Sequence, residues 1–152
     1  NAIDVIKECL LPLTRVLTPN IPEAEILVGR KIIGECDFFE VAKELSTYYG
    51  VSVLLKAGHL SGNTLTDYFY NVENDSLTLL PSMRVNTKNT HGTGCTLSSA
   101  FAAALAKGND LTYAAKLAKK YIEQAIIAGA EYEIGHGHGP VNHFFEFEKN
   151  NR

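Results

Sequence analysis

The sequence predicts an α/β fold, with a mostly parallel sheet covered by helices. Strand-like runs alternate with amphipathic helical patterns along the 152 residues, which is typical of parallel α/β sheets. The segment 51–56, VSVLLK, is an unbroken apolar run, as expected for a strand that is covered on both faces. Contents of 45% hydrophobic and 20% charged residues are ordinary for a globular domain. We find no internal repeat or linker, so residues 1–152 are treated as part of one domain.

The first third of the chain predicts a helix, a short strand and two further helices. Residues 2–10 form an amphipathic helix that ends before Pro12, and residues 14–18 form a strand that stops at Pro19. Residues 37–49 form a helix with Gly50 as its C-terminal stop. Its expected start is a capping box made by Asp37 and Glu40, and its expected inner face is Phe38, Val41, Ala42, Leu45, Tyr48 and Tyr49.

The remaining two thirds predict a strand, a hairpin and two helices. Residues 64–70 and 76–81 are expected to pair as strands around the turn region 71–75. The helix that follows residue 94 is apolar on all sides, so we expect it to be deeply buried. Asp110 caps the last helix. The expected inner stripe of that helix is Leu111, Ala114, Ala118, Tyr121, Ile122 and Ala125.

Charge, hydropathy and cysteine content exclude several classes of function. A net charge of −3 provides no basic face, which argues against nucleic acid as a partner. No apolar run approaches the roughly 20 residues that span a bilayer. The three cysteines form no C-x-x-C pair and cannot all be disulfide-bonded, which fits a reducing cytosol and predicts a cytoplasmic protein.

Residues 89–105, NTHGTGCTLSSAFAAAL, are the most informative segment of the chain. Gly92 and Gly94 lack a Cβ, so the backbone can approach a ligand closely. The helix that follows begins with unpaired amides at the positive end of its dipole, which suits a phosphoryl group. Cys95 lies at the rim, where the same field favours the thiolate. The alternative is a plain helix-capping turn in which Cys95 is a small buried apolar residue.

The motif THGTGCTLSSAFAAALAKG (90–108) resembles the anion-hole segment of hydroxymethylpyrimidine/phosphomethylpyrimidine kinases, the ribokinase-like enzymes of thiamine biosynthesis. Segments 10–29, 51–60 and 135–145 resemble three further parts of that family, in the same order. Ala57 stands where the family usually has glycine. Members of the family are nearly twice as long, and this chain begins where their second half begins. The resemblance therefore implies the C-terminal, nucleotide-binding and anion-hole part of a three-layer ribokinase-like sandwich.

The resemblance also implies an activity and its residues. The family transfers phosphate from ATP, with Mg²⁺, to hydroxymethylpyrimidine and then to its monophosphate. Amides of Gly92, Thr93, Gly94 and Cys95 would hold the γ-phosphate, and the Cys95 thiol would act as general base. Five residues are expected to bind the nucleotide, namely Lys56, His59, Thr90, Lys119 and Asn142. Asn20 and Glu23 are expected near the magnesium–phosphate cluster.

Each of these residues has a structural alternative. Asn20 and Glu23 form the pattern of a capping box, which is compatible with a metal role because one carboxylate oxygen can cap while the other faces a hydrated cation. Lys56 could be a solvated lysine at a strand end, although ligands bind at that end of strands in open α/β sheets. His59 could hydrogen-bond its own loop, Lys119 could belong to a solvated helix face, and residues 139–143 could be a docked C-terminal loop.

Two other functions remain open at the level of the sequence. One is a pyridoxal kinase of the same cysteine-bearing branch, because the residues that would separate the two substrates lie in the family's N-terminal half. The other is a non-catalytic half-domain that binds nucleotide or assembles with another chain. We expect the 152-residue chain alone to be inactive, and to form a homo-oligomer or to pair with the N-terminal half.

Overall fold

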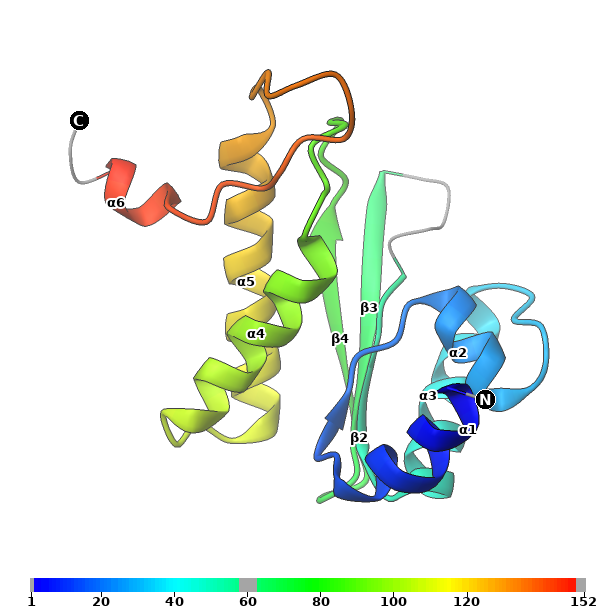
Figure 1. Cartoon of the computed structure of the whole chain (residues 1–152). Coiled ribbons are helices and arrows are strands. Elements are labelled where there is room, and N and C mark those ends of the chain that lie inside the picture. Colours follow the sequence, from blue (N-terminus) through cyan, green and yellow to red (C-terminus); the bar gives the residue numbers. More distant parts are fainter. Residues whose placement is uncertain (1, 58–62, 150–152) are drawn as a thin grey trace. The chain divides into compact units, whose positions relative to one another are not determined.

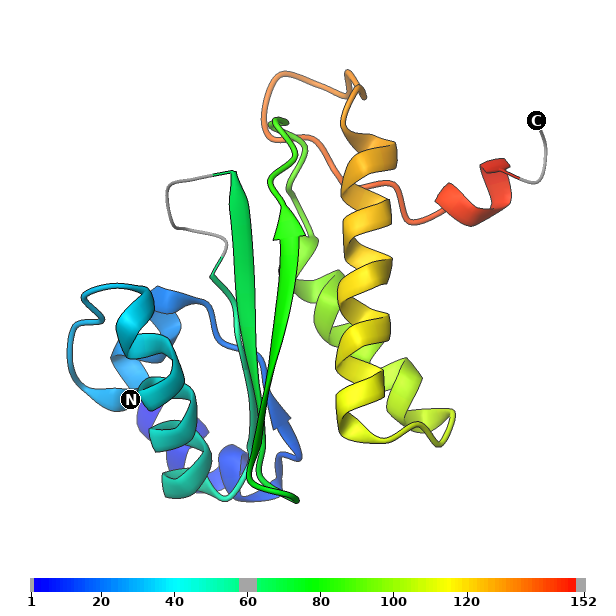
Figure 2. The same ribbon diagram turned by 180° about the vertical axis from the view of Figure 1, so that it is seen from behind.

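The computed structural model describes residues 2–57 and 63–149 (Figure 1). The chain divides into two compact units, Asn1–Ser82 and Met83–Arg152. Figure 2 shows the same ribbon from behind. No helix in the described part of the chain combines the length and apolar character needed to cross a membrane.

The first unit is a four-stranded sheet with its helices on one side (Figures 1 and 2). In chain order its elements are α1 (Ala2–Val5), a π-helix (Ile6–Leu10), a 3₁₀ turn (Leu11–Leu13), β1 (Val16–Leu17), α2 (Ile21–Val28), a 3₁₀ turn (Glu35–Asp37), α3 (Phe38–Tyr49), β2 (Ser52–Leu55), β3 (Thr64–Asn71) and β4 (Ser76–Met83). The predicted helix 2–10 is therefore present with a π-helical second half, and Pro12 lies inside the following 3₁₀ turn.

The strand order is β1-β2-β3-β4, and the sheet is mixed rather than mostly parallel. β1 pairs with β2 in parallel, but β2 pairs with β3 antiparallel. The reason lies in the connections, because residues 56–63 are too few for the crossover of about a dozen residues that a parallel pair needs. The strands predicted at 64–70 and 76–81 are confirmed as neighbours, joined by the turn 72–75.

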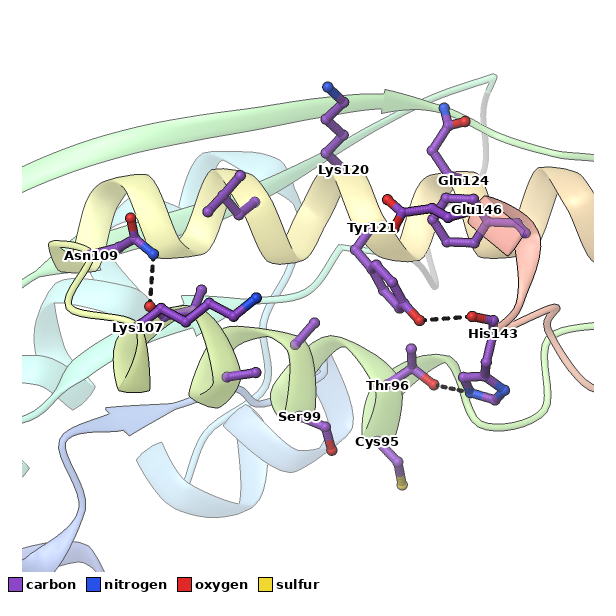
Figure 3. A pocket seen from close by; sticks show the side chains of 15 residues that line it. Cys95, Thr96, Ser99, Lys107, Asn109, Lys120, Tyr121, Gln124, His143 and Glu146 are labelled. Carbon is purple, nitrogen blue, oxygen red and sulfur yellow. Dashed lines mark hydrogen bonds between the residues drawn. The ribbon is translucent and has the colours of Figure 1, made fainter. Parts of the chain in front are cut away.

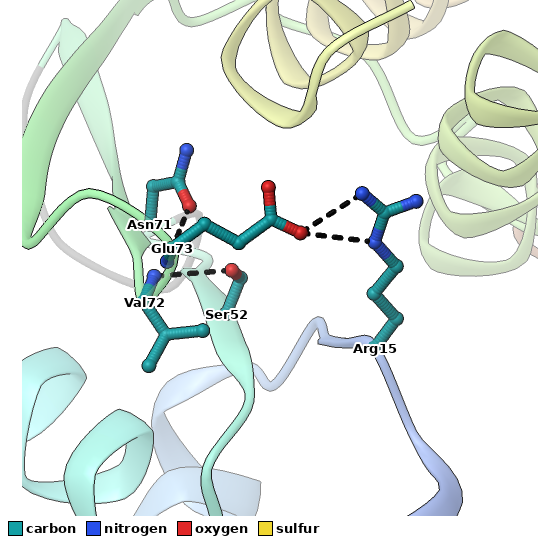
Figure 4. Close-up of polar contacts among 5 residues, drawn as sticks. All are labelled: Arg15, Ser52, Asn71, Val72 and Glu73. Carbon is teal, nitrogen blue, oxygen red and sulfur yellow. Dashed lines mark hydrogen bonds and ion pairs between the residues drawn. The ribbon is translucent and has the colours of Figure 1, made fainter. Parts of the chain in front are cut away.

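The hairpin turn is tied back to the start of the sheet by polar contacts (Figure 4). The Val72 amide donates to Ser52 Oγ over 3.2 Å, and the Glu73 amide donates to Asn71 Oδ1 over 3.0 Å. The Arg15 guanidinium forms an ion pair with Glu73 Oε1 at 2.9 Å, and both side chains are more than half exposed. These contacts connect three segments that are distant in the sequence.

The core of the first unit lies between β2 and α3. Every residue of β2 is buried, as the apolar run predicted, and the α3 face formed by Phe38, Val41, Ala42 and Leu45 packs into the same cluster. Tyr48 was wrongly placed on that face. It is 80% exposed in the last turn of α3, where its ring packs edge-to-face with Tyr49.

The prediction for the C-terminal end of α3 is confirmed, and the prediction for its N-terminal end is wrong. Gly50 ends the helix in a left-handed conformation with φ of 68°, as predicted. The capping box of Asp37 and Glu40 is wrong, because a 3₁₀ turn runs into α3 and Asp37 is already helical. Its carboxylate turns back and accepts from the Ile33 amide over 2.9 Å.

The second unit is built on a helical hairpin of α4 (Thr93–Ala106) and α5 (Leu111–Gly129), followed by α6 (Phe145–Lys149). Asp110 caps α5 by accepting from the Tyr113 amide over 2.8 Å, as predicted. The predicted inner stripe of α5 is buried except for Tyr121, which is half-buried.

The deep burial predicted for α4 is wrong in this chain. Only one stripe of the helix is buried, formed by Thr96, Leu97, Phe101 and Ala104. Ala102 and Ala103 on its other side are exposed. Within this unit α4 packs mainly against α5, which can cover one face of a helix.

Candidate phosphate loop and adjoining groove

The turn before α4 has the conformation that its glycines allow. Gly92 adopts φ of 86° as the residue preceding the helix, in the left-handed region that favours glycine. Gly94 lies inside the first turn of α4 with helical backbone. We call residues 90–95 the phosphate loop.

Two adjacent amides of the phosphate loop point out of the helix start without a partner. The Thr93 amide donates to the Thr90 carbonyl over 3.3 Å, and the Thr96 amide donates to the Gly92 carbonyl over 2.9 Å. Within residues 2–57 and 63–149, the amides of Gly94 and Cys95 have no acceptor. Because they stand at the positive end of a 14-residue helix, they favour an anion.

The Cys95 side chain is an exposed free thiol, so the alternative of a small buried residue is wrong. Figure 3 shows it on the side of α4 that faces away from α5. Cys9 and Cys36 are also free and exposed, and the described residues contain no disulfide.

The C-terminal segment is fastened beside the phosphate loop. The His91 amide donates to the Gly139 carbonyl over 3.0 Å, and the Val141 amide donates to the His91 carbonyl over 3.4 Å, which forms a parallel bridge. The Asn142 amide donates to the Ala125 carbonyl of α5 over 2.9 Å. Residues 139–142 therefore connect the loop to α5.

His143 joins this segment to the first turn of α4 (Figure 3). Its Nε2 lies 2.8 Å from Oγ1 of Thr96, the buried residue that follows Cys95. The Tyr121 hydroxyl donates to the His143 carbonyl over 3.0 Å. His143 is thus held at two points, its ring by a side chain of α4 and its backbone carbonyl by a side chain of α5.

A groove of about 820 Å³ opens between α4, α5 and the start of α6 (Figure 3). One end is lined by Cys95, Thr96 and His143. Its walls are mainly small and apolar along α4, whereas Lys107 and Lys120 supply positive charge and Glu146 supplies negative charge. The groove therefore adjoins the phosphate loop at Cys95.

A second group of predicted residues meets in the first unit, at the C-terminal ends of β1 and β2. Asn20 and Lys56 form a parallel bridge, and the Lys56 amide donates to the Pro19 carbonyl over 2.9 Å. The capping box is confirmed, because Asn20 Oδ1 accepts from the Glu23 amide and Glu23 Oε2 accepts from the Asn20 amide, both at 2.8 Å. Lys56 therefore lies beside the start of α2.

Asp67 was not predicted from the sequence as a residue that supports the site. This residue of β3 is 5% exposed, and its Oδ1 accepts from the buried Ala57 amide over 2.8 Å. It thereby holds the chain directly after Lys56. The available signal was an acidic residue inside the strand pattern TLTDYFY, where a charge is rarely placed without a partner.

The other predicted nucleotide-binding residues occupy different surroundings. The Asn142 side chain is buried and engaged, since Nδ2 donates to the Tyr132 hydroxyl over 2.6 Å and Oδ1 accepts from the Phe144 amide over 2.8 Å. Lys119 lies on α5 outside the groove wall, to which Lys120 contributes instead. Thr90 is exposed in the phosphate loop. His59 lies outside the described residues.

The family model of phosphomethylpyrimidine kinase matches residues 1–142. The chain belongs to the phosphomethylpyrimidine kinase family. Over 150 residues it is 45% identical to hydroxymethylpyrimidine/phosphomethylpyrimidine kinase of Rhizobium meliloti. That alignment covers 98% of this chain and 56% of the relative. The chain spans about half the length of the curated relatives it matches.

The fold of this chain matches part of the ribokinase-like fold of solved structures. An ADP complex of Bacillus subtilis pyridoxal kinase superposes with a TM-score of 0.83 at 33% identity, covering 95% of this chain and 53% of that one. Phosphomethylpyrimidine kinase from Clostridium difficile superposes with a TM-score of 0.65 at 38% identity, covering 82% and 48%. The mixed sheet and helices of this chain therefore form about half of that fold.

Proposed function

We propose that the intact gene product phosphorylates hydroxymethylpyrimidine and its monophosphate with ATP, and that this chain holds the transferred phosphate and supplies the general base. The observation that carries the proposal is the start of α4, where two unpaired amides adjoin an exposed thiol in a chain of this family. The cytoplasm is the proposed location.

The proposed chemistry is a direct phosphoryl transfer. The substrate hydroxymethyl oxygen attacks the γ-phosphorus of ATP, the bond from that phosphorus to the β–γ bridging oxygen breaks, and ADP leaves. The hydroxyl proton passes to the Cys95 thiolate. The loop amides of Gly92, Gly94 and Cys95 bind the phosphoryl oxygens as their charge spreads, which is where catalysis of this reaction chiefly lies. The Thr93 amide, predicted with them, donates instead to the Thr90 carbonyl.

The remaining roles concern the nucleotide. We propose that Lys56 contacts phosphate oxygens, because it directly follows the buried strand β2, at the C-terminal end where α/β sheets bind ligands. Thr90 is also proposed to bind the nucleotide, as part of the phosphate loop. We propose that Lys119 also contacts the nucleotide. The Asn142 side chain is already hydrogen-bonded to Tyr132 and Phe144, which favours an indirect role for it in nucleotide binding.

The Asn20 and Glu23 pair fits a hydrated Mg²⁺. The cap uses only Oε2 of Glu23, and the residue is exposed, so Oε1 can face a water of the ion's shell. A bound Mg²⁺ would neutralise phosphate charge. The protein's own contribution is to hold the Glu23 carboxylate in place through its bond with the Asn20 amide.

A pyridoxal kinase is the second candidate, favoured by the close superposition on the Bacillus subtilis pyridoxal kinase. The higher identity to a pyrimidine kinase, 45% against 33%, supports the first candidate. We also propose that the chain works together with the residues that make up the other half of its relatives, with further self-association as the alternative.

The test is a substrate comparison with the intact gene product. ATP consumption is measured with hydroxymethylpyrimidine, with its monophosphate and with pyridoxal, and the phosphorylated products are identified by mass spectrometry. We expect kcat/KM to be highest for the two pyrimidines. Preference for pyridoxal would establish the second candidate, and no turnover with any of the three would refute both.

A further inference from the structure

Asn89 stands directly before the phosphate loop and is almost completely buried, with 1% exposure. Its side-chain Nδ2 donates to three carbonyl oxygens, those of Gly129 at 2.8 Å, Ala130 at 3.3 Å and Tyr132 at 2.7 Å. These carbonyls belong to the end of α5 and the turn after it. The last carbonyls of a helix lack partners within the helix, and here they form a small network. The Gly129 carbonyl also accepts from the Tyr132 amide over 3.1 Å and the Ala130 carbonyl from Thr87 Oγ1 over 3.0 Å, and the Asn89 amide joins these groups.

The C-terminal segment closes over the other side of Asn89. A Cβ built on Gly139 would lie 2.1 Å from Asn89 Oδ1 and 2.7 Å from its Cγ, so only glycine fits against this side chain. The Gly139 carbonyl also accepts a hydrogen bond from the amide of His91, which lies two residues after Asn89. Asn89 is therefore held between α5 and the segment that is bridged to the phosphate loop.

We propose that Asn89 is a positioning residue. It holds the phosphate loop in the conformation in which the Gly94 and Cys95 amides can bind one anion together. The identity of that anion as the γ-phosphate rests on the proposed function, whereas the fixing of the loop does not. Glycine at positions 92 and 94 leaves the loop with a large conformational freedom. The Asn89 amide removes that freedom at the point where the loop begins.

The side-chain chemistry supports an amide in particular. Aspartate has the same shape but no donor, and it would place a charge against three carbonyl oxygens. Alanine leaves these acceptors without the donor and empties the space beside Gly139. A protein that needs only filled space at this point could use an apolar residue, so the donor group carries the role.

The test separates the donor from the space that it fills, and it uses the intact gene product. Three variants are compared with the wild type: Asn89→Ala, Gly139→Ala, and the two combined. Gly139→Ala alone should lower Tm because of the clash with Asn89. In the combined variant the new methyl group would lie 3.5 Å from the remaining Cβ of residue 89, an ordinary contact, so the part of the Tm loss caused by the clash should be recovered and only the part caused by the missing donor should remain. Gly137→Ala is the matched control, since a Cβ there meets nothing within 4 Å.

Two measurements then decide the proposal on the combined variant. We expect hydrogen exchange of the His91 and Thr96 amides, which donate to the Gly139 and Gly92 carbonyls, to be faster than in the wild type. We expect KM for ATP to stay roughly 10-fold raised, because the lost donor is not replaced. KM for the pyrimidine should change little. Recovery of both amide exchange and ATP KM together with Tm would show that Asn89 only fills space and would overturn the proposal.

The exchange measurement keeps this inference separate from the proposed function. If the wild type phosphorylates none of the three substrates, the proposed function fails, but amide exchange still reports whether Asn89 orders the loop. If Asn89→Ala does not fold, the combined variant and Asn89→Ser, which shortens the donor, supply the same comparison. Unchanged exchange of the hydrogen-bonded His91 and Thr96 amides in a folded variant would refute the positioning role.

Discussion

Replacement of Asp67 gives the sharpest test of the first unit. Its carboxylate accepts from the Ala57 amide over 2.8 Å, and the two residues are 5% and 1% exposed, so water cannot readily replace the lost acceptor. A buried donor without a partner costs about 1–3 kcal/mol. We therefore expect Asp67→Ala to lower the free energy of unfolding by about 2 kcal/mol.

The matched control is Asp67→Asn, which removes the charge but keeps an acceptor oxygen in the same place. Its expected loss is less than about 1 kcal/mol if the acceptor is what matters. Both values come from urea unfolding of the intact gene product, followed by far-UV circular dichroism. Equal losses in the two variants would show that charge, and not the bond to Ala57, stabilises this strand end.

The same pair of variants tests the link between Asp67 and the proposed site. Ala57 follows Lys56 directly, so release of the Ala57 amide should also loosen the lysine backbone. We expect KM for ATP to rise in Asp67→Ala and to stay near the wild-type value in Asp67→Asn. A normal KM in a folded Asp67→Ala variant would refute this part of the reasoning.

Four further predictions follow from individual side chains. Cys95→Ala should lower kcat by roughly 10²–10⁴-fold with little change in ATP binding, and near-normal turnover would make the thiol structural. Glu23→Gln should leave Tm nearly unchanged, since glutamine can also cap, but should shift the Mg²⁺ titration of turnover to higher concentration; an unchanged titration would leave only the cap. A double-mutant cycle on Arg15 and Glu73 should give less than about 1 kcal/mol, falling as salt is added, because the pair is exposed. Hydrogen bonds from the Lys31 side chain and the Ile32 amide lower the pKa of Glu25, so its stabilisation is present at neutral pH and is lost as the pH falls below the ordinary value of 4.5. The Tm difference between wild type and Glu25→Gln should therefore vanish in acid, and a difference that grows there would contradict the assigned sign.

The parts of the fold that the sequence predicted are those set by neighbouring residues. The buried strand at 51–56 and the hairpin at 64–81 follow from apolar runs and a local turn, and the Asn20 capping box closes over three residues. The same signature failed at Asp37, because the turn before it had already become helical. The direction of β3 was not visible in its own residues, since it depends on the short connection from β2.

The site shows the same limit more clearly. The phosphate loop was found because Gly92 to Cys95 form one continuous motif, whose glycine conformation and helix start are local properties. Asn89 gave no such signal, because an asparagine before a glycine turn is an ordinary turn residue and its role depends on carbonyls 40 or more positions away. The bond between Thr96 and His143 spans 47 positions in the same way. Local patterns can therefore locate the groups proposed to contact the phosphate, whereas the side chains that hold those groups in place are found only when distant segments meet. For that reason the Asn89 variants test the fold of the second unit and its proposed chemistry at the same point.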